Sequence, residues 1–366
     1  MKNLLTLAIV LSSVSAFATR ARVTALGNSP HLIDVSQSSP DQVFGLGDSL
    51  TIESGSKTFV APLTAAKYTT NAEGTLYKTF AGGKLGLVLG HQDMLVYNSR
   101  VLAAANAASG LTTILKGQQN PLEVSYSMGL SDMAFSAGLI YSNYNDKFNA
   151  EKESTMGVRV GVSNSMFYGN VKLIAADKYE NTAGANFNEY KGKMGIDLKG
   201  GLNFGETLSA HANIMTAGAK TAINGTDKAD FDSMLISVKL IDAVKKDGNH
   251  FFYGAGLSTT TSKEKIADSK SSTLNLPLII GLEATATSWL TLRASVSQDV
   301  LLSNEKTEGG LTPSETNPGL NTTKYAAGAS LAFNKISIDG TITNGGTNQS
   351  INGGDLLGTV GLTYNF

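Results

Sequence analysis

Apolar and polar residues alternate along most of this chain. Residues 122–128, Leu-Glu-Val-Ser-Tyr-Ser-Met, place four apolar side chains on one face of an extended segment and three polar side chains on the other. Successive side chains of a β-strand point to opposite faces, so this period of two predicts strands with one apolar and one polar face. The same alternation recurs at 156–162 and ends the chain at 358–366. The pattern therefore predicts an all-β protein.

Sixteen strands are expected from this alternation, with fourteen as the alternative count. The expected ranges are 47–54, 74–81, 84–91, 121–129, 131–143, 154–163, 165–177, 188–199, 205–217, 229–241, 250–261, 272–286, 289–301, 323–333, 335–343 and 355–366.

The segments between these strands alternate between short and long. Short ones include 82–83 and 287–288. The long, polar ones are 55–73, 92–120, 144–153, 178–187, 218–228, 262–271, 302–322 and 344–354. Short turns at one end and long loops at the other are typical of a transmembrane antiparallel β-barrel with periplasmic turns and extracellular loops. We therefore predict such a barrel over residues 46–366.

The start of the chain has the features of a secretory signal peptide. Residues 1–18 contain Lys2, an apolar stretch and small residues around Phe17. The apolar stretch is too short for a transmembrane helix, which needs about 20 residues. We expect the mature chain to begin near Thr19, with residues 19–45 forming either a periplasmic arm or a plug inside the barrel.

Composition excludes several classes of protein. The chain has no cysteine, so it uses neither disulfides nor thiol chemistry. It has a formal net charge of −1 and no stripe of lysine and arginine, so we expect no nucleic-acid partner. With four histidines, none at metal-ligand spacing, and no Gly-x-Ser-x-Gly element, we expect no catalytic residues, metal or cofactor.

Aromatic residues gather near the ends of the expected strands, as they do at membrane interfaces. Near the short turns or the C-terminus lie Phe80, Phe167, Phe204, Phe251, Trp289, Phe333 and Phe366. Near the long loops lie Tyr97, Tyr141, Tyr144, Tyr179 and Tyr190. A soluble β-sandwich would share the alternation, but it does not require two aromatic girdles or an ordered series of short and long connections.

The C-terminal strand resembles the C-terminal signature of Gram-negative outer-membrane proteins. It places Val360, Leu362, Tyr364 and Phe366 on one face and ends on an aromatic residue. The resemblance implies that this strand is the assembly signal read by the barrel assembly machinery. It also implies a location in the outer membrane of a Gram-negative bacterium, with membrane lipids around the barrel.

The expected mature start, residues 22–35, resembles the N-terminal segments of FadL-like and porin-like barrels. Ser39, Pro40 and Asp41 stand where FadL-like proteins often have an Asn-Pro-Ala element. Over the whole length, the chain is similar to porin-like major outer-membrane proteins. That similarity implies a diffusion channel and a homotrimer, and the small residues of 326–332 are our candidate for its subunit contact.

Charged and imidazole side chains of both signs lie opposite the apolar face. They are Glu123, Arg159, Lys172, Lys191, Lys193, Asp197, His211, Lys239, Glu283, Arg293, Asp299 and Asp339. A barrel of this strand number encloses an aqueous channel, so we expect these residues to line a pore for small hydrophilic solutes and ions. Two alternatives remain: a FadL-like transporter of hydrophobic compounds, which would need an apolar lining, and a structural or surface barrel.

The longest connection, 92–120, contains an alanine-rich stretch at 99–109 that favours a short helix. In porins, one long loop folds into the lumen and narrows it. Asp93, Arg100 and Lys116 are the candidate constriction residues of this loop. The alternative is a cap outside the barrel or a contact with a neighbouring subunit.

Overall fold

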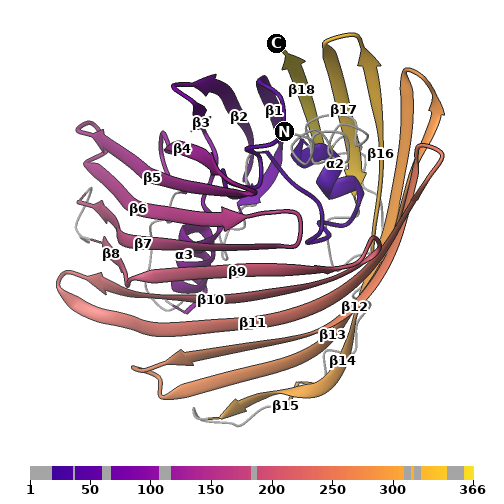
Figure 1. Ribbon diagram of the computed structural model, residues 1–366. Helices are drawn as coiled ribbons and strands as arrows, with labels where there is room; N and C mark the ends of the chain where they lie inside the picture. The colour runs from indigo at the N-terminus through magenta and orange to yellow at the C-terminus, as the bar shows by residue number, and fades with distance from the viewer. Residues whose placement is uncertain are drawn as a thin grey trace.

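The computed structural model describes residues 19–35, 38–59, 67–106, 117–182, 188–308, 315–316, 323–343 and 358–366. The expected signal peptide and Lys116 lie outside the described residues. Two helices occur in the described part of the chain, α2 (Arg20–Ala25) and α3 (Met94–Asn106) (Figure 1). Neither of them is long and apolar enough to cross a membrane.

Strands make up most of the described chain, and each pairs antiparallel with its neighbours. They are β1 (Ser49–Phe59), β2 (Lys67–Phe80), β3 (Gly83–Leu89), β4 (Leu122–Leu130), β5 (Met133–Asp146), β6 (Glu151–Ser163), β7 (Phe167–Asn181), β8 (Asn188–Gly192), β9 (Gly195–Phe204), β10 (Leu208–Ile223), β11 (Thr226–Lys246), β12 (Asn249–Glu264), β13 (Ser269–Thr287), β14 (Leu290–Glu308), β15 (Glu315–Thr316), β16 (Lys324–Phe333), β17 (Ile336–Thr343) and β18 (Thr359–Asn365).

The sheet closes on itself because its first and last strands pair. In β1 and β18, Ser49 lies opposite Asn365 and Gly55 opposite Thr359. Strands β8 and β9 share one position between β7 and β10, and β15 and β16 share one position beside β14. The described strands therefore form a closed antiparallel barrel of sixteen strands, which confirms the predicted fold and strand number.

The outer wall of the barrel is apolar and the inner wall is polar. Leu139 and Val160 are exposed on the outside, whereas their neighbour Arg159 is buried on the inside. The C-terminal residues Val360, Leu362, Tyr364 and Phe366 are all exposed on the outside, as predicted. Closure pairs the backbone polar groups of every strand, which a lipid environment requires. The protein is therefore an outer-membrane β-barrel.

Several predicted long loops are instead strand extensions. Residues 218–228 form the turn end of the long β10–β11 hairpin. Strand β10 runs to Ile223, β11 begins at Thr226, and only Asn224 and Gly225 turn between them. Both turn residues have positive φ, which suits a tight two-residue hairpin. Similarly, 144–153 and 262–271 are largely paired strand. The prediction failed there because polar sequence pairs as well as apolar sequence once the register is set.

The aromatic girdle beside the short turns is observed, with Phe204 and Phe333 among its exposed members. The expected tyrosine girdle is wrong at three positions. Tyr97 lies on helix α3, and Tyr179 and Tyr190 are buried. Tyr179 and Tyr190 pack with Ala219 and Phe231 on the inner side of the strand extensions. Alternation alone could not assign the face of these two tyrosines, because polar residues occupy both faces of the strand around each of them.

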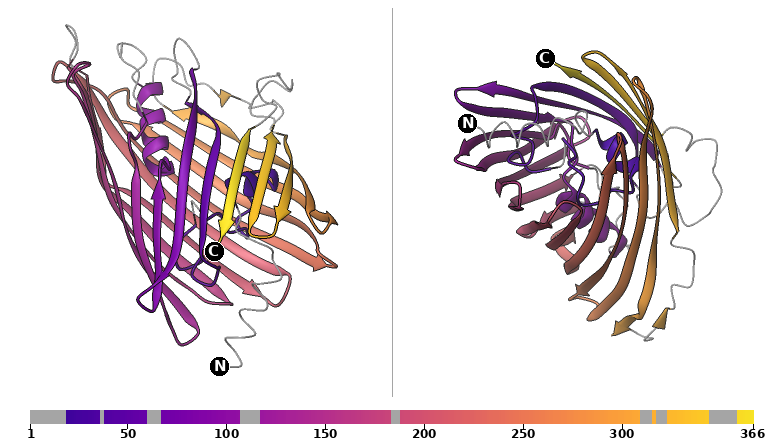
Figure 2. Two further views of the ribbon diagram at one scale, coloured as in Figure 1. Left: turned by 90° about the horizontal axis from the view of Figure 1, so that it is seen from above. Right: turned by 45° about the vertical axis from the view of Figure 1, so that its right-hand side comes forward.

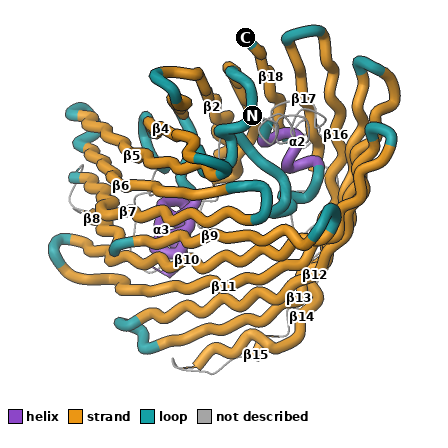
Figure 3. Tube along the Cα trace, viewed as in Figure 1, coloured by secondary structure: helices purple, strands orange, loops and turns teal. Residues whose placement is uncertain are grey.

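Two segments occupy the interior of the barrel (Figures 1 and 3). The first comprises residues 19–35 and 38–46 and includes helix α2. The second contains helix α3. In the first segment, Leu26 packs against Ile241, Phe252 and Ile279 of the wall. The apolar core of this barrel thus lies where the inner segments meet the wall, and the two views of Figure 2 show both helices enclosed by the curved sheet.

We predict that an arginine on the outer wall destabilises the barrel. Leu139 of β5 is 64% exposed on the lipid-facing side. Replacement by arginine should lower the free energy of unfolding in phospholipid vesicles by about 2–4 kcal/mol, because a charge near the bilayer midplane loses its hydration. The conservative variant Leu139→Val should stay within about 1 kcal/mol of the original. Equal stability of the arginine variant would show that this wall does not face lipid.

Candidate functional site

The barrel lumen is the candidate functional site, and the N-terminal segment is fixed across it. The backbone N–H of Arg20 donates to Oε1 of Glu53 on β1 at 2.5 Å, and its guanidinium donates to Oε1 of Glu73 on β2 at 2.5 Å. Arg22 binds Glu283 on β13 with two parallel bonds of 2.7 and 2.9 Å. Bidentate bonds of this kind fix orientation as well as position. The segment is therefore bound to two separate parts of the wall, β1 with β2 and β13.

Three of the predicted pore-lining residues belong to this anchoring network. Arg293 donates to Glu283 at 2.5 Å and to Asp339 at 3.0 Å. Asp339 also accepts a bond of 2.9 Å from the hydroxyl of Thr19. These side chains face the lumen as expected, but they bind one another and the N-terminal segment.

An aromatic contact holds the middle of the N-terminal segment. His31 lies edge-on to Phe252, with ring centroids 4.6 Å apart, and to His250 at 5.2 Å. Burial, with the nearby His250 as a further cause, lowers the pKa of His31 well below its ordinary value. His31 is therefore neutral at pH 7 and packs as an aromatic ring.

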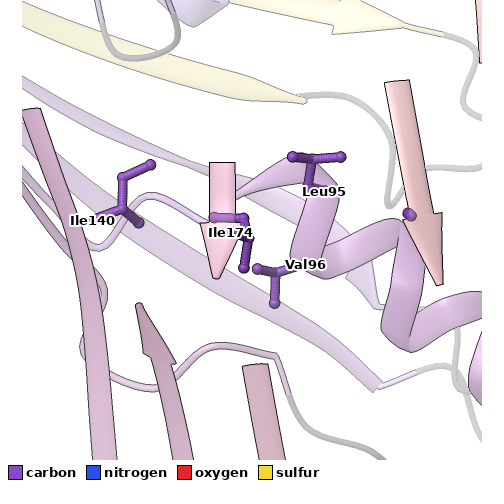
Figure 4. Packing of buried hydrophobic residues seen from close by; sticks show 5 residues of the cluster. Leu95, Val96, Ile140 and Ile174 are labelled. Atoms are coloured by element: carbon purple, nitrogen blue, oxygen red, sulfur yellow. The ribbon is translucent and has the colours of Figure 1, made fainter. Parts of the chain in front are cut away.

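Helix α3 packs against the inner wall on the opposite side. Leu95 and Val96 pack with Ile140 of β5, Ile174 of β7 and Ala217 of β10 (Figure 4). The predicted helix in the loop at 92–120 is thus observed, although it begins before the alanine-rich stretch. Its described part lies inside the barrel, so the alternative of an outside cap is wrong for these residues.

Arg100 anchors helix α3 by a buried charge cluster. Its side chain has no exposed area and binds Glu153 of β6 at 2.8 Å and Asp177 of β7. The hydroxyl of Tyr190 donates to Asp177 at 3.0 Å, and the ring of Tyr190 lies 5.7 Å from the guanidinium carbon. Arg100, a candidate constriction residue from the sequence, therefore fixes helix α3 to the wall and does not line the cavity.

Asp93, the second candidate constriction residue, binds the wall at the start of helix α3. Its carboxylate lies 2.8 Å from the ammonium of Lys172 and accepts a bond from the N–H of Leu95. Burial alone would raise the pKa of Asp93, but the charge and hydrogen bond of Lys172 together with the charge of Arg159 outweigh burial and lower the pKa to about 2. Asp93 is therefore ionised over the physiological range.

Ten of the twelve predicted pore-lining residues face the inside of the barrel. They are Glu123, Arg159, Lys172, Asp197, His211, Lys239, Glu283, Arg293, Asp299 and Asp339.

Lys191 and Lys193 do not face the lumen. Tyr190 is buried and Lys191 beside it is exposed, whereas Asp197 is buried on β9. Lys193 binds Asp230 and Asp232, which alternate with the inward residues of β11. The strand is interrupted between β8 and β9, so the inward face changes from even to odd numbers. An uninterrupted alternation could not predict that change.

The inner segments leave a cavity of about 660 Å³ against the wall formed by β6 to β11. Five predicted residues line it: Arg159, Lys172, Asp197, His211 and Lys239.

The sequence prediction missed the other lining residues, among them Arg20, Tyr168 and Lys199. Lys199 follows Asp197 by two residues and was open to the same alternation argument. Arg20 precedes every strand, so only the folded path of the N-terminal segment could place it in the cavity.

No family model matches the sequence, and no curated protein is similar enough to count as a match. Among solved structures, the FrpB iron transporter of Neisseria meningitidis is 7% identical over 81% of this chain, with a TM-score of 0.43; this chain spans 53% of that transporter. A bacterial polysaccharide outer membrane secretin is 9% identical over 88% of this chain and 98% of its own, with a TM-score of 0.43. A loop-deletion mutant of OmpT, an outer membrane protein of Vibrio cholerae, is 12% identical over 87% and 97%, with a TM-score of 0.36. At these values, no activity is transferred to this chain.

We predict that Arg100→Leu releases helix α3 while the barrel stays closed. The substitution leaves Glu153 and Asp177 buried without their shared cation, which costs about 3–5 kcal/mol. Amide hydrogen exchange over residues 94–100 should therefore accelerate by about 100-fold or more, with little change in the strands. Lys152→Leu, which removes an exposed charge next to Glu153, is the control. Unchanged exchange in the helix would contradict an anchoring role for Arg100.

The Asp93–Lys172 contact should respond to acid. The pKa of Asp93 in the folded protein, about 2, lies below its unfolded value. The contact therefore stabilises the folded state above about pH 4, and this contribution, about 2 kcal/mol, is lost as the pH falls through about 2. Hydrogen exchange of helix α3 should distinguish the original chain from Asp93→Asn at pH 5 but hardly at pH 2. Asp132→Asn, in the short turn after β4, should match the original chain at both pH values.

Proposed function

We propose that the protein is a channel for the passive diffusion of small hydrophilic solutes and ions across the outer membrane. The observation that supports this most strongly is the polar cavity between the inner segments and the wall of β6 to β11. Its wall side carries charged, hydroxyl, imidazole and amide groups, including Lys172, Asp197, His211 and Asn213. Such groups replace the hydration of a polar solute and offer little to a hydrocarbon chain.

The lining favours this proposal over transport of hydrophobic compounds. Apolar side chains such as Val23, Leu32 and Met94 do border the cavity, but they come from the inner segments. The barrel wall opposite them presents charges of both signs. A site for an apolar ligand is instead lined predominantly by apolar and aromatic side chains, with few polar groups.

The two inner segments make this channel narrow. A barrel of sixteen strands without inner segments encloses a wide aqueous channel. Here Arg20 and Arg22 hold one segment, and Arg100 holds the other, through buried ion pairs. Solutes would therefore pass through the residual cavity, and only small ones would fit. Association into trimers, with a contact around residues 326–332, remains a prediction.

Planar-bilayer recordings of the refolded protein, together with vesicle-swelling assays using neutral sugars of increasing size, test this function. We expect small, steady conductance steps and passage of only the smallest sugars. The double variant Arg20→Ala/Arg22→Ala should raise the conductance by about twofold or more, because the N-terminal segment loses its wall contacts and the channel widens.

The matched control is Lys147→Ala/Lys152→Ala, which removes the same two charges from exposed positions outside the lumen. It should conduct like the original chain. If neither the original chain nor the Arg20/Arg22 variant conducts, and vesicles admit no sugar, the diffusion-channel proposal is wrong.

A further inference from the structure

Basic side chains form a row across the wall of the cavity. We call this row the basic ladder: Arg159 on β6, Lys172 on β7, Lys199 on β9 and Lys239 on β11, all of which line the cavity. Arg159 lies directly opposite Lys172 in the pairing of β6 with β7. Lys239 lies opposite His211 in the pairing of β10 with β11. The ladder therefore runs across five neighbouring strands, β6, β7, β9, β10 and β11.

Carboxylates compensate one half of the basic ladder more fully than the other. Arg159 binds Glu123 at 3.1 Å, and Lys172 binds Asp93 at 2.8 Å. Lys199 has only Asp197, at 3.2 Å, and Asp197 also lies 3.6 Å from Lys172. Among the described residues, no carboxylate lies within salt-bridge distance of Lys239. Excess positive charge therefore gathers at Lys199 and Lys239.

The cavity lining contains five lysine or arginine residues and two aspartates. Arg20, Arg159 and Lys172 are paired with Glu73, Glu123 and Asp93, so the less compensated positive charge of the lining is that of Lys199 and Lys239. Low-dielectric walls strengthen the field of such charges and raise the local concentration of ions of the opposite sign. Because the side chain of Lys199 is 43% exposed, it remains accessible to a solute in the lumen.

Polar groups lie between the two lysines. Lys199 lies opposite Asn213 in the pairing of β9 with β10. Two residues along β10, His211 lies opposite Lys239 of β11. Strands β9 and β11 are separated only by β10, so the two backbones are about 10 Å apart and two lysine side chains can approach one small solute. His211 is fixed in this gap by Tyr168 at 3.0 Å and Ser209 at 2.9 Å.

We propose that the gap between Lys199 and Lys239 is a binding subsite for small oxyanions, such as carboxylates and inorganic phosphate, and makes the channel anion-selective. This rests on the proposed diffusion function and names its solute class. Oxyanions suit the gap because two cations and neighbouring polar hydrogens can satisfy several oxygen atoms at once. The cavity volume of about 660 Å³ admits a small organic acid or phosphate but no polymer.

The test uses the full-length barrel and the double variant Lys199→Gln/Lys239→Gln. In a bilayer with a KCl gradient, the reversal potential gives the ratio of chloride to potassium permeability. We expect the original chain to prefer chloride, and the double variant to reduce that ratio by about threefold or more. Adding inorganic phosphate or acetate should reduce the chloride current of the original chain and affect the double variant much less.

Lys191→Gln is the matched control, because it removes a lysine of the same wall whose side chain points away from the lumen. It should keep the selectivity and the phosphate effect of the original chain. A channel that conducts but prefers potassium, or a double variant as anion-selective as the original chain, would overturn the oxyanion subsite while leaving the diffusion function intact.

A binding measurement separates the two proposals. Phosphorus NMR line broadening of inorganic phosphate, added to the barrel in a phosphorus-free detergent, should occur with the original chain and be lost in Lys199→Gln/Lys239→Gln. Broadening without any conductance would support the subsite and refute the channel. If the original chain broadens the signal no more than the double variant does, the proposed subsite is refuted.

Discussion

The pairing of β1 with β18 is the constraint on which the rest of this structure depends. Inside a membrane, an unpaired backbone N–H or C=O group costs several kcal/mol, so the sheet must close. Closure gives every strand one face toward lipid and one face toward the lumen. Exposed Leu362 and buried Thr363 on the last strand show that division at neighbouring positions. It also creates an interior too wide for its own side chains to fill.

That interior is filled by chain that is not part of the sheet. Segments on both sides of the first three strands enter the barrel, and a buried arginine fixes each of them to the wall. Arg20 binds Glu73 through its guanidinium and Glu53 through its backbone N–H, and the guanidinium of Arg100 binds Glu153 and Asp177. Buried charges are tolerated only when they are paired and hydrogen-bonded, so these contacts fix the position of each segment closely.

The cavity left between the inner segments and the wall takes its charge from the wall side chains that line it. The N-terminal segment covers acidic side chains of β1, β2 and β13, where its arginines bind, and Lys199 and Lys239 remain in the lining of the cavity. A solute therefore meets Lys199 and Lys239 rather than Glu53 or Glu283. The electrostatic character of the proposed channel therefore depends more on which wall charges the inner segments cover than on the overall composition of the wall.

The sequence by itself determined the barrel, its sixteen strands and the lumen-facing position of residues such as Arg159 and Asp339, because the alternation of side chains is a local property of each strand. It also predicted a helix in the loop that contains Arg100. Only the tertiary structure decided that residues 19–35 and 38–46 lie in the lumen. It alone also decided that Arg100 anchors helix α3 and does not line the cavity, and that Lys191 points outward. Those outcomes depend on contacts between segments distant in sequence and on one interruption between β8 and β9, which no periodicity within a strand encodes.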